Sequence, residues 1–169
     1  MTWIAKRSGV AVEFIAKIFR RFSQSAAPLV EILSWSPRLL IAAALFEVFA
    51  PRNKKIAREL KLIRLRVSFQ VQCPWCVEMN STDLKSANIT EEELRFLSQG
   101  GPVPSSLLPR EMNVIRMAGV MSQSPVRMPQ DLAHALDRDF SRSEIVTMTW
   151  TAAQVNFFAR LFQSWVRNP

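Results

Sequence analysis

Two cysteines, Cys73 and Cys76, are the residues of this chain whose type and spacing best suit chemistry. They lie in "QVQCPWCVEMNS" (71–82), with Pro74 between them, and no other cysteine occurs. Cys73-Pro74 predicts the start of a helix, which puts Cys73 at the N-cap and Cys76 in the first turn. Unpaired N–H groups and the positive end of the helix dipole favour a thiolate there. Two thiols one turn apart can close a disulfide, so the pattern indicates a redox-active dithiol.

Other interpretations of the cysteine pair stay open. A structural zinc site needs four ligands, usually Cys or His. The chain has two Cys and one His, so we expect no metal and no other cofactor. Two buried, inert cysteines also fit the sequence, because cysteine is a common core residue. No secretory signal is visible in residues 1–22, so we expect a reducing, cytoplasmic location, where a structural disulfide is not expected.

The elements that must position these cysteines are predicted to be helices. Hydrophobic residues make up 49% of the 169 residues, and glycine occurs only four times. This composition favours an ordered domain with a core, and its commonest residues are helix formers. No strand pattern is visible. We expect an all-α, single-domain bundle of about eight helices over residues 27–169, preceded by an N-terminal arm over residues 1–26.

Helix start signals divide the chain into these elements. Thr90 with Glu93, and Ser141 with Glu144, match the capping box. Pro109 suits the first turn of a helix. We expect helices over about 28–35, 37–50, 54–71, 74–87, 91–97, 109–121, 130–137 and 142–166.

The residue pattern of the N-terminal arm predicts a basic amphipathic helix over residues 3–22. Its apolar face is formed by Ile4, Ala11, Ile15, Ile18 and Phe22. Such a helix can lie on an anionic membrane surface. We favour packing of the apolar face against the domain or a neighbouring subunit, because the polar face includes Glu13.

Charge and hydropathy narrow the choice of partners. The net charge of +8 is compatible with an acidic partner. The Lys and Arg residues are spread along the predicted helices, however, so we expect no nucleic-acid partner. The most apolar run, "LLIAAALFEVFA" (39–50), is too short to span a bilayer and carries Glu47.

Two stretches of the sequence resemble one known family. "ELKLIRLRVSFQVQCPWCVEMNSTDLKSANITEEELRFL" (59–97) is similar to the core of the carboxymuconolactone decarboxylase and alkylhydroperoxidase D family, and "FSRSEIVTMTWTAAQVNFFARL" (140–161) resembles its C-terminal helix. The resemblance implies an all-helical fold and a homo-oligomer, a trimer or a hexamer. The alkylhydroperoxidase branch reduces peroxides with its two cysteines, which a thiol electron donor recycles. The decarboxylase branch acts on a lactone ring without a cysteine pair.

The resemblance also implies roles for individual residues. Cys76 matches the peroxidatic thiol and Cys73 its resolving partner. The family has a histidine where this chain has Asn80, and a glutamate where it has Lys61. Asn80 can form hydrogen bonds but cannot titrate, so the family's proton relay is missing. The single histidine, His134, is expected at the surface.

Three functions are compatible with these observations. The first is a thiol-dependent, peroxidase-type oxidoreductase with Cys73, Cys76 and Asn80 as its site residues. The second is a catalytically inactive or ligand-binding relative with the same fold. The third is a protein that associates with a membrane surface through residues 3–22.

Overall fold

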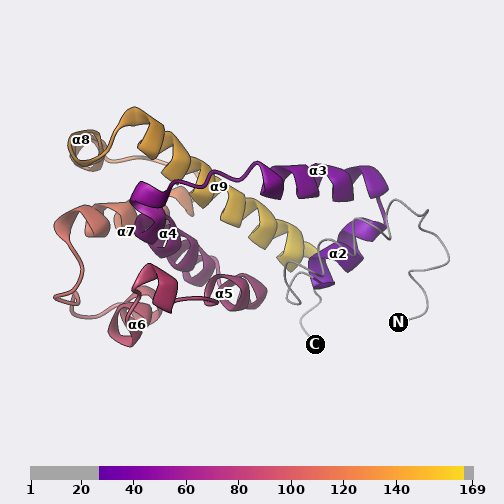
Figure 1. Cartoon of the computed structure of the whole chain (residues 1–169), viewed down its shortest axis with the longest axis horizontal. Helices are drawn as coiled ribbons and strands as arrows, with labels where there is room; N and C mark the ends of the chain where they lie inside the picture. Colours follow the sequence, from indigo (N-terminus) through magenta and orange to yellow (C-terminus); the bar gives the residue numbers. More distant parts are fainter. Residues whose placement is uncertain (1–26, 166–169) are drawn as a thin grey trace. The chain divides into compact units, whose positions relative to one another are not determined.

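The protein is all-helical, as predicted from its composition. The structure, a computed structural model, describes residues 27–165. This part of the chain contains eight α-helices, two 3₁₀-helices and no strand (Figure 1). The elements are α2 (Ala27–Ser34), α3 (Pro37–Val48), η3 (Lys54–Ile56), α4 (Ala57–Gln70), α5 (Pro74–Asn80), η4 (Lys85–Ala87), α6 (Glu91–Gln99), α7 (Pro109–Met121), α8 (Gln130–Asp139) and α9 (Arg142–Trp165).

The described residues divide into two compact units, one that ends at Ala50 and one that begins at Pro51. Helices α2 and α3 belong to the first unit, and the other six α-helices belong to the second. The helices that we expected to form one domain over residues 27–169 are therefore shared between two units. The predicted arm, residues 1–26, lies outside the described residues, and its boundary stays a prediction.

Helix α4 is the element around which the second unit is built. It contacts α5, α6, α7 and α9. Leu60, Ile63 and Val67 of α4 join one buried apolar cluster with α7, α8 and α9. Leu62 and Leu65 join a second cluster with residues of α6 and α7. Because α4 is apolar on both sides, it fixes the positions of the helices that pack on either side of it.

The helix predicted over residues 74–87 is interrupted. Helix α5 ends at Asn80, and a turn leads to the short η4. In this turn the Thr82 hydroxyl donates to the Met79 carbonyl at 3.0 Å, and Asp83 has a φ of 56°. Ser, Thr and Asp side chains offer the backbone an alternative to helical hydrogen bonds. The prediction of a continuous helix was wrong because it overlooked this competition within "NSTD" (80–83).

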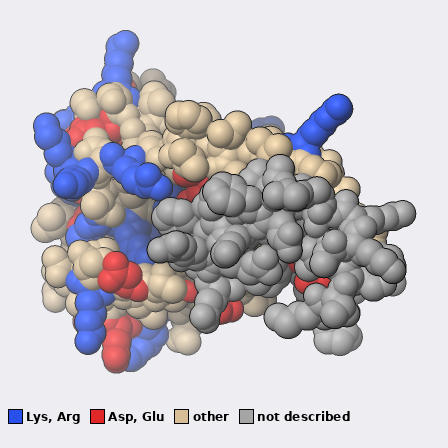
Figure 2. All heavy atoms as spheres, turned by 45° about the vertical axis from the view of Figure 1, so that its right-hand side comes forward, with Lys and Arg blue, Asp and Glu red and all other residues tan. Residues whose placement is uncertain are grey.

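The charged side chains of the described surface do not form one basic patch in the view of Figure 2. On the left-hand side of this face, Lys and Arg side chains are interspersed with Asp and Glu side chains. Within residues 27–165, no helix has both the length and the apolar character that crossing a membrane requires.

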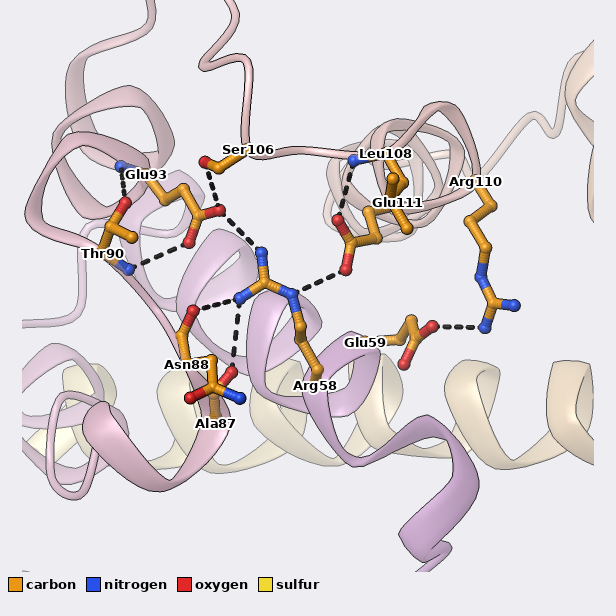
Figure 3. A network of polar contacts seen from close by, with 10 residues as sticks. All are labelled: Arg58, Glu59, Ala87, Asn88, Thr90, Glu93, Ser106, Leu108, Arg110 and Glu111. Atoms are coloured by element: carbon orange, nitrogen blue, oxygen red, sulfur yellow. Dashed lines mark hydrogen bonds and ion pairs between the residues drawn. The ribbon is translucent and has the colours of Figure 1, made fainter.

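Arg58, in the first turn of α4, joins the starts of α6 and α7 (Figure 3). Its Nη2 donates to Glu93 Oε1 at 2.6 Å, and its Nε donates to Glu111 Oε1 at 2.7 Å. Its Nη1 donates to the carbonyl oxygens of Ala87 and Asn88. A single guanidinium therefore binds two carboxylates and two backbone carbonyls that lie far from it in sequence.

Both glutamates that bind Arg58 also cap the N-terminus of their own helix. The Thr90 N–H donates to Glu93 at 3.0 Å and the Glu93 N–H donates to the Thr90 hydroxyl at 3.2 Å, which confirms the predicted capping box. The Ser106 hydroxyl donates to Glu93 at 2.7 Å. At α7, the Leu108 N–H donates to Glu111 at 2.8 Å. Both carboxylates are buried, so the single positive charge of Arg58 offsets part of their negative charge in the protein interior.

This network predicts that the protein loses stability in acid. Burial raises the pKa of Glu93, but the hydrogen bonds from Arg58, Thr90 and Ser106 outweigh it, so the pKa lies below its usual value of 4.5. A carboxyl group whose pKa is lower in the folded state stabilises the fold above its unfolded-state pKa, and this contribution is lost as the pH falls through the folded-state pKa. We expect the free energy of unfolding, measured in urea from about pH 7 to about pH 3, to fall below about pH 4.5.

Replacing Glu93 with Gln provides the control for this prediction. The glutamine side chain does not titrate, so the decrease in stability below about pH 4.5 should be shallower in Glu93→Gln than in the wild type. An equal decrease in both proteins would show that other carboxylates cause the acid sensitivity.

Candidate dithiol site

Cys73 and Cys76 form a disulfide at the start of α5. Cys73 is the N-cap residue, and its Sγ accepts a hydrogen bond from the Cys76 N–H at 3.2 Å. Pro74 occupies the first turn, as predicted. The two Cα atoms are 5.2 Å apart, a separation within the range that disulfides span. The exposed fractions of Cys73 and Cys76 are 0% and 2%, so the pair is buried.

The turn between α4 and α5 is held by bonds from both α4 and α9. Gln72 in this turn has a φ of 51°, a left-handed conformation that costs a non-glycine residue about 1–2 kcal/mol. The Cys73 N–H donates to the Ser68 carbonyl at 3.2 Å. From α9, the Gln163 amide donates to the carbonyls of Val71 at 2.7 Å and Gln72 at 3.2 Å. These bonds fix where the disulfide lies relative to α4 and α9.

An aromatic pair adds a second contact between α5 and α9. The rings of Trp75 and Phe162 are stacked, with centroids 4.9 Å apart and planes 17° from parallel. Trp75 lies between the two cysteines in sequence, so this stack positions the turn of helix that carries them. Stacked pairs of this kind contribute about 0.5–1.5 kcal/mol beyond their buried area.

Asn80 lies one helical turn after Cys76 and anchors α5 to α4. Its Nδ2 donates to the Cys76 carbonyl at 2.8 Å and to the Ser68 hydroxyl at 3.0 Å. The Ser68 oxygen is in turn 2.7 Å from the Arg64 carbonyl and 3.2 Å from the Cys76 carbonyl. The Asn80 amide thus binds the backbone beside Cys76 and a hydroxyl on α4. These contacts hold the end of α5 and supply no acid or base.

Ser68 is a site residue that the sequence analysis missed. It is fully buried and contacts both halves of the cysteine motif, through its carbonyl to Cys73 and its hydroxyl to Asn80 and Cys76. A signal was present in the sequence. Ser68 follows Lys61 by seven residues, and this spacing places the two residues on the same face of a helix.

Lys61 stabilises the turn that follows α5. Its Nζ donates to the Thr82 carbonyl at 2.5 Å. Burial lowers the pKa of Lys61, the positive charge of Arg64 lowers it further, and Asp83 acts in the opposite direction. This hydrogen bond of Lys61 goes to backbone and not to either sulfur, so it gives no support to a thiolate.

Three other polar residues, His134, Asn156 and Arg160, take no part in these contacts. His134 is exposed on α8, as predicted. Asn156 donates from Nδ2 to the Ala152 carbonyl at 2.9 Å within α9, and Arg160 is exposed. Throughout residues 27–165, no three His, Cys, Asp or Glu side chains are grouped so that they could hold a metal ion.

Comparison with known proteins gives a likeness to a solved structure. No protein-family model and no curated protein matches the chain. A crystal structure from Agrobacterium tumefaciens, of a protein of unknown function described as a candidate antioxidant defence protein AhpD, is similar with a TM-score of 0.71. The identity is 22% over 81% of this chain and 94% of that chain. The likeness shows the fold alone, and the all-helical, alkylhydroperoxidase D-like fold predicted from the sequence is confirmed.

Proposed function

We propose that this protein is a thiol-dependent oxidoreductase whose Cys73 and Cys76 cycle between a dithiol and a disulfide. A peroxide is the oxidant, and a thiol donor is the reductant. The observation that carries the proposal is the disulfide at the N-cap of α5, held in place by α4 and α9. The description of the Agrobacterium protein as a candidate antioxidant defence protein supports it.

The chemistry of the cycle balances with these two residues and an external thiol. The Cys76 thiolate attacks one peroxide oxygen, so that an S–O bond forms, the O–O bond breaks and the leaving oxygen takes a proton to become an alcohol or water. The Cys73 thiol then attacks the sulfenic sulfur, which closes the disulfide and releases water. Two electrons from a donor dithiol restore both thiols. The Cys76 N–H and the Ser68 carbonyl keep Cys73 in reach for the second step.

The proposed cycle is slow, because the leaving oxygen needs a proton and none of the side chains bonded to the cysteine turn delivers one. Asn80 cannot titrate, and the hydrogen bond of Lys61 goes to Thr82. A positioned acid–base group typically contributes about 10²–10⁴ in rate. Water is therefore the proton source in this proposal.

Replacing the cysteines one at a time tests the proposal. We expect Cys76→Ser to lose peroxide consumption in the presence of dithiothreitol, because the attacking sulfur is gone. We expect Cys73→Ser to stop at a sulfenic acid at Cys76, which dimedone traps and mass spectrometry detects. Arg160→Gln, a change at an exposed residue of α9, serves as the control and should behave like the wild type. If both cysteine variants consume peroxide like the wild type, the pair is structural and the proposal is wrong.

A second candidate is a non-catalytic relative that retains the disulfide for stability. The burial of both cysteines favours this candidate, since a reactive thiol needs access to its substrate. A disulfide that resists dithiothreitol in the folded protein and opens only in urea would support it. The predicted trimer or hexamer and the thiol donor remain part of the first proposal, and association with a membrane surface through residues 3–22 remains an alternative to it.

A further inference from the structure

A second candidate site lies away from the dithiol, between α4, α6 and α7. It is a hollow of about 460 Å³, and all of its lining residues belong to the second unit. Arg66 and Gln70 contribute from α4, and Phe96 contributes from α6. Arg66 and Ser68 are two residues apart on α4, so they point to nearly opposite sides of this helix. The hollow is therefore a separate site from the cysteine pair.

Arg66 brings an uncompensated positive charge to this hollow. Its Nη1 donates to the Leu97 carbonyl at 3.1 Å. Its Nε is buried and has no hydrogen-bond partner among the residues that the structure describes. Among residues 27–165 no carboxylate forms an ion pair with Arg66. A buried N–H donor without an acceptor is costly, and a guanidinium binds a carboxylate through two parallel hydrogen bonds.

Gly119 of α7 keeps the space beside this guanidinium open. A Cβ atom at Gly119 would lie 3.8 Å from Arg66 Nε and 3.9 Å from Nη2. A side chain longer than a methyl group would therefore occupy the volume next to the charge. The second arginine of the hollow, Arg116, is already paired with Asp131 at 2.6 Å. The charge available to a ligand is thus that of Arg66.

The other walls of the hollow combine four apolar side chains with the polar side chains of Gln70, Asn113 and Gln123. Phe96, Met112, Ile115 and Val120 line it, and each of them is at least partly buried. Cavities that bind small molecules have volumes of about 300–1,000 Å³ and combine apolar walls with a few polar groups. One positive charge beside four apolar side chains fits a ligand with one negative charge and an apolar body. An inorganic anion would leave the apolar walls unused, and a neutral lipid would leave the Arg66 donor unused.

We propose that this hollow binds an amphipathic organic carboxylate. The carboxylate accepts hydrogen bonds from Arg66, and the hydrocarbon part lies against Phe96, Met112 and Val120. This proposal does not rest on the peroxide chemistry of Cys73 and Cys76.

Calorimetric titration of the full chain with octanoate and with 1-octanol tests the proposal. We expect octanoate to bind saturably at one site per chain, and octanol to bind about tenfold more weakly or worse because it lacks the charge. Equal affinity for octanoate and octanol, or no saturable binding of octanoate, would overturn the proposal.

Three variants locate the site. Arg66→Gln should weaken octanoate binding by about tenfold or more and leave octanol binding unchanged. Arg66→Lys, which keeps the charge, should retain part of the octanoate affinity. This variant tests the effect of the charge if circular dichroism shows that Arg66→Gln is poorly folded. Arg95→Gln is the matched control, because Arg95 is an exposed arginine of α6 that does not line the hollow.

Filling the hollow with a larger side chain distinguishes a ligand-binding site from a contact between subunits. Gly119→Leu should weaken octanoate and octanol alike, since it occupies the space beside Arg66. If it instead changes the mass measured by light scattering and leaves octanoate affinity intact, the hollow is a contact between copies of the chain and the proposal is wrong. If Arg95→Gln lowers the octanoate affinity as much as Arg66→Gln does, the binding is a non-specific attraction to the net positive charge and the proposal is wrong.

Discussion

Replacing Arg58 with Met is expected to lower the free energy of unfolding by about 3–5 kcal/mol, the range for breaking a buried ion pair by removing one partner. The guanidinium holds both Glu93 and Glu111, whose side chains are 0% and 4% exposed. Without it, two buried carboxylates would face each other with no compensating cation. The carbonyls of Ala87 and Asn88 would lose their donor as well.

Urea unfolding at neutral pH measures this effect. Arg138→Met is the control, because the Arg138 side chain is largely exposed and its loss should change stability by no more than about 0.5 kcal/mol. Combining Arg58→Met with Glu93→Gln and Glu111→Gln should restore part of the stability, since no buried charge remains uncompensated. An Arg58→Met variant as stable as Arg138→Met would show that water reaches the two carboxylates.

Replacing Asn80 with His, together with Lys61→Glu, is expected to raise peroxide turnover by about 10²-fold or more, if the proposed dithiol chemistry is correct. Asn80 already lies one turn after Cys76 and binds its carbonyl. A histidine there would place a titratable group beside the reacting sulfur, and a glutamate at position 61 could orient it. The new imidazole would supply the proton that the leaving oxygen requires.

The initial rate of peroxide consumption with dithiothreitol measures this gain. Asn80→Ala is the control, because it also removes the amide contacts to Ser68 and Cys76 but adds no acid, so it should not be faster than the wild type. Adding Cys76→Ser to the variant that carries Asn80→His and Lys61→Glu should abolish the gain. A wild type that is already as fast as the double variant would mean that another residue carries the proton.

The local parts of the fold could be predicted from the sequence. The start of α6 at Thr90, the start of α9 at Ser141 and the placement of Cys73 at an N-cap follow from side chains that bond to backbone three residues away. Such bonds depend on neighbouring residues alone, and the sequence contains them directly.

The long-range contacts could not be predicted in the same way. Arg58 is 35 residues from Glu93 and 53 from Glu111, and its sequence position carries no sign of either partner. The sequence identifies Glu93 as a residue that caps α6, but it does not show that this side chain is buried. Only a buried carboxylate requires a cation from a distant part of the chain. Similarly, the sequence places Lys61 and Asn80 near the cysteines, while the direction of each side chain depends on how α4 packs against α5.

The ion pairs of Arg58 with Glu93 and Glu111 also limit how this sequence can change over generations. A neutral replacement of Arg58 leaves the buried carboxylates of Glu93 and Glu111 without their cation, whereas a neutral replacement of either glutamate leaves Arg58 paired with the other one. A lineage that loses Arg58 first therefore passes through a less stable intermediate before the two glutamates can follow. Thr90 depends on the same contacts, because the Glu93 carboxylate accepts hydrogen bonds both from the Thr90 N–H and from Arg58. These four positions should therefore be inherited as a group, whatever happens to the chemistry at Cys73 and Cys76.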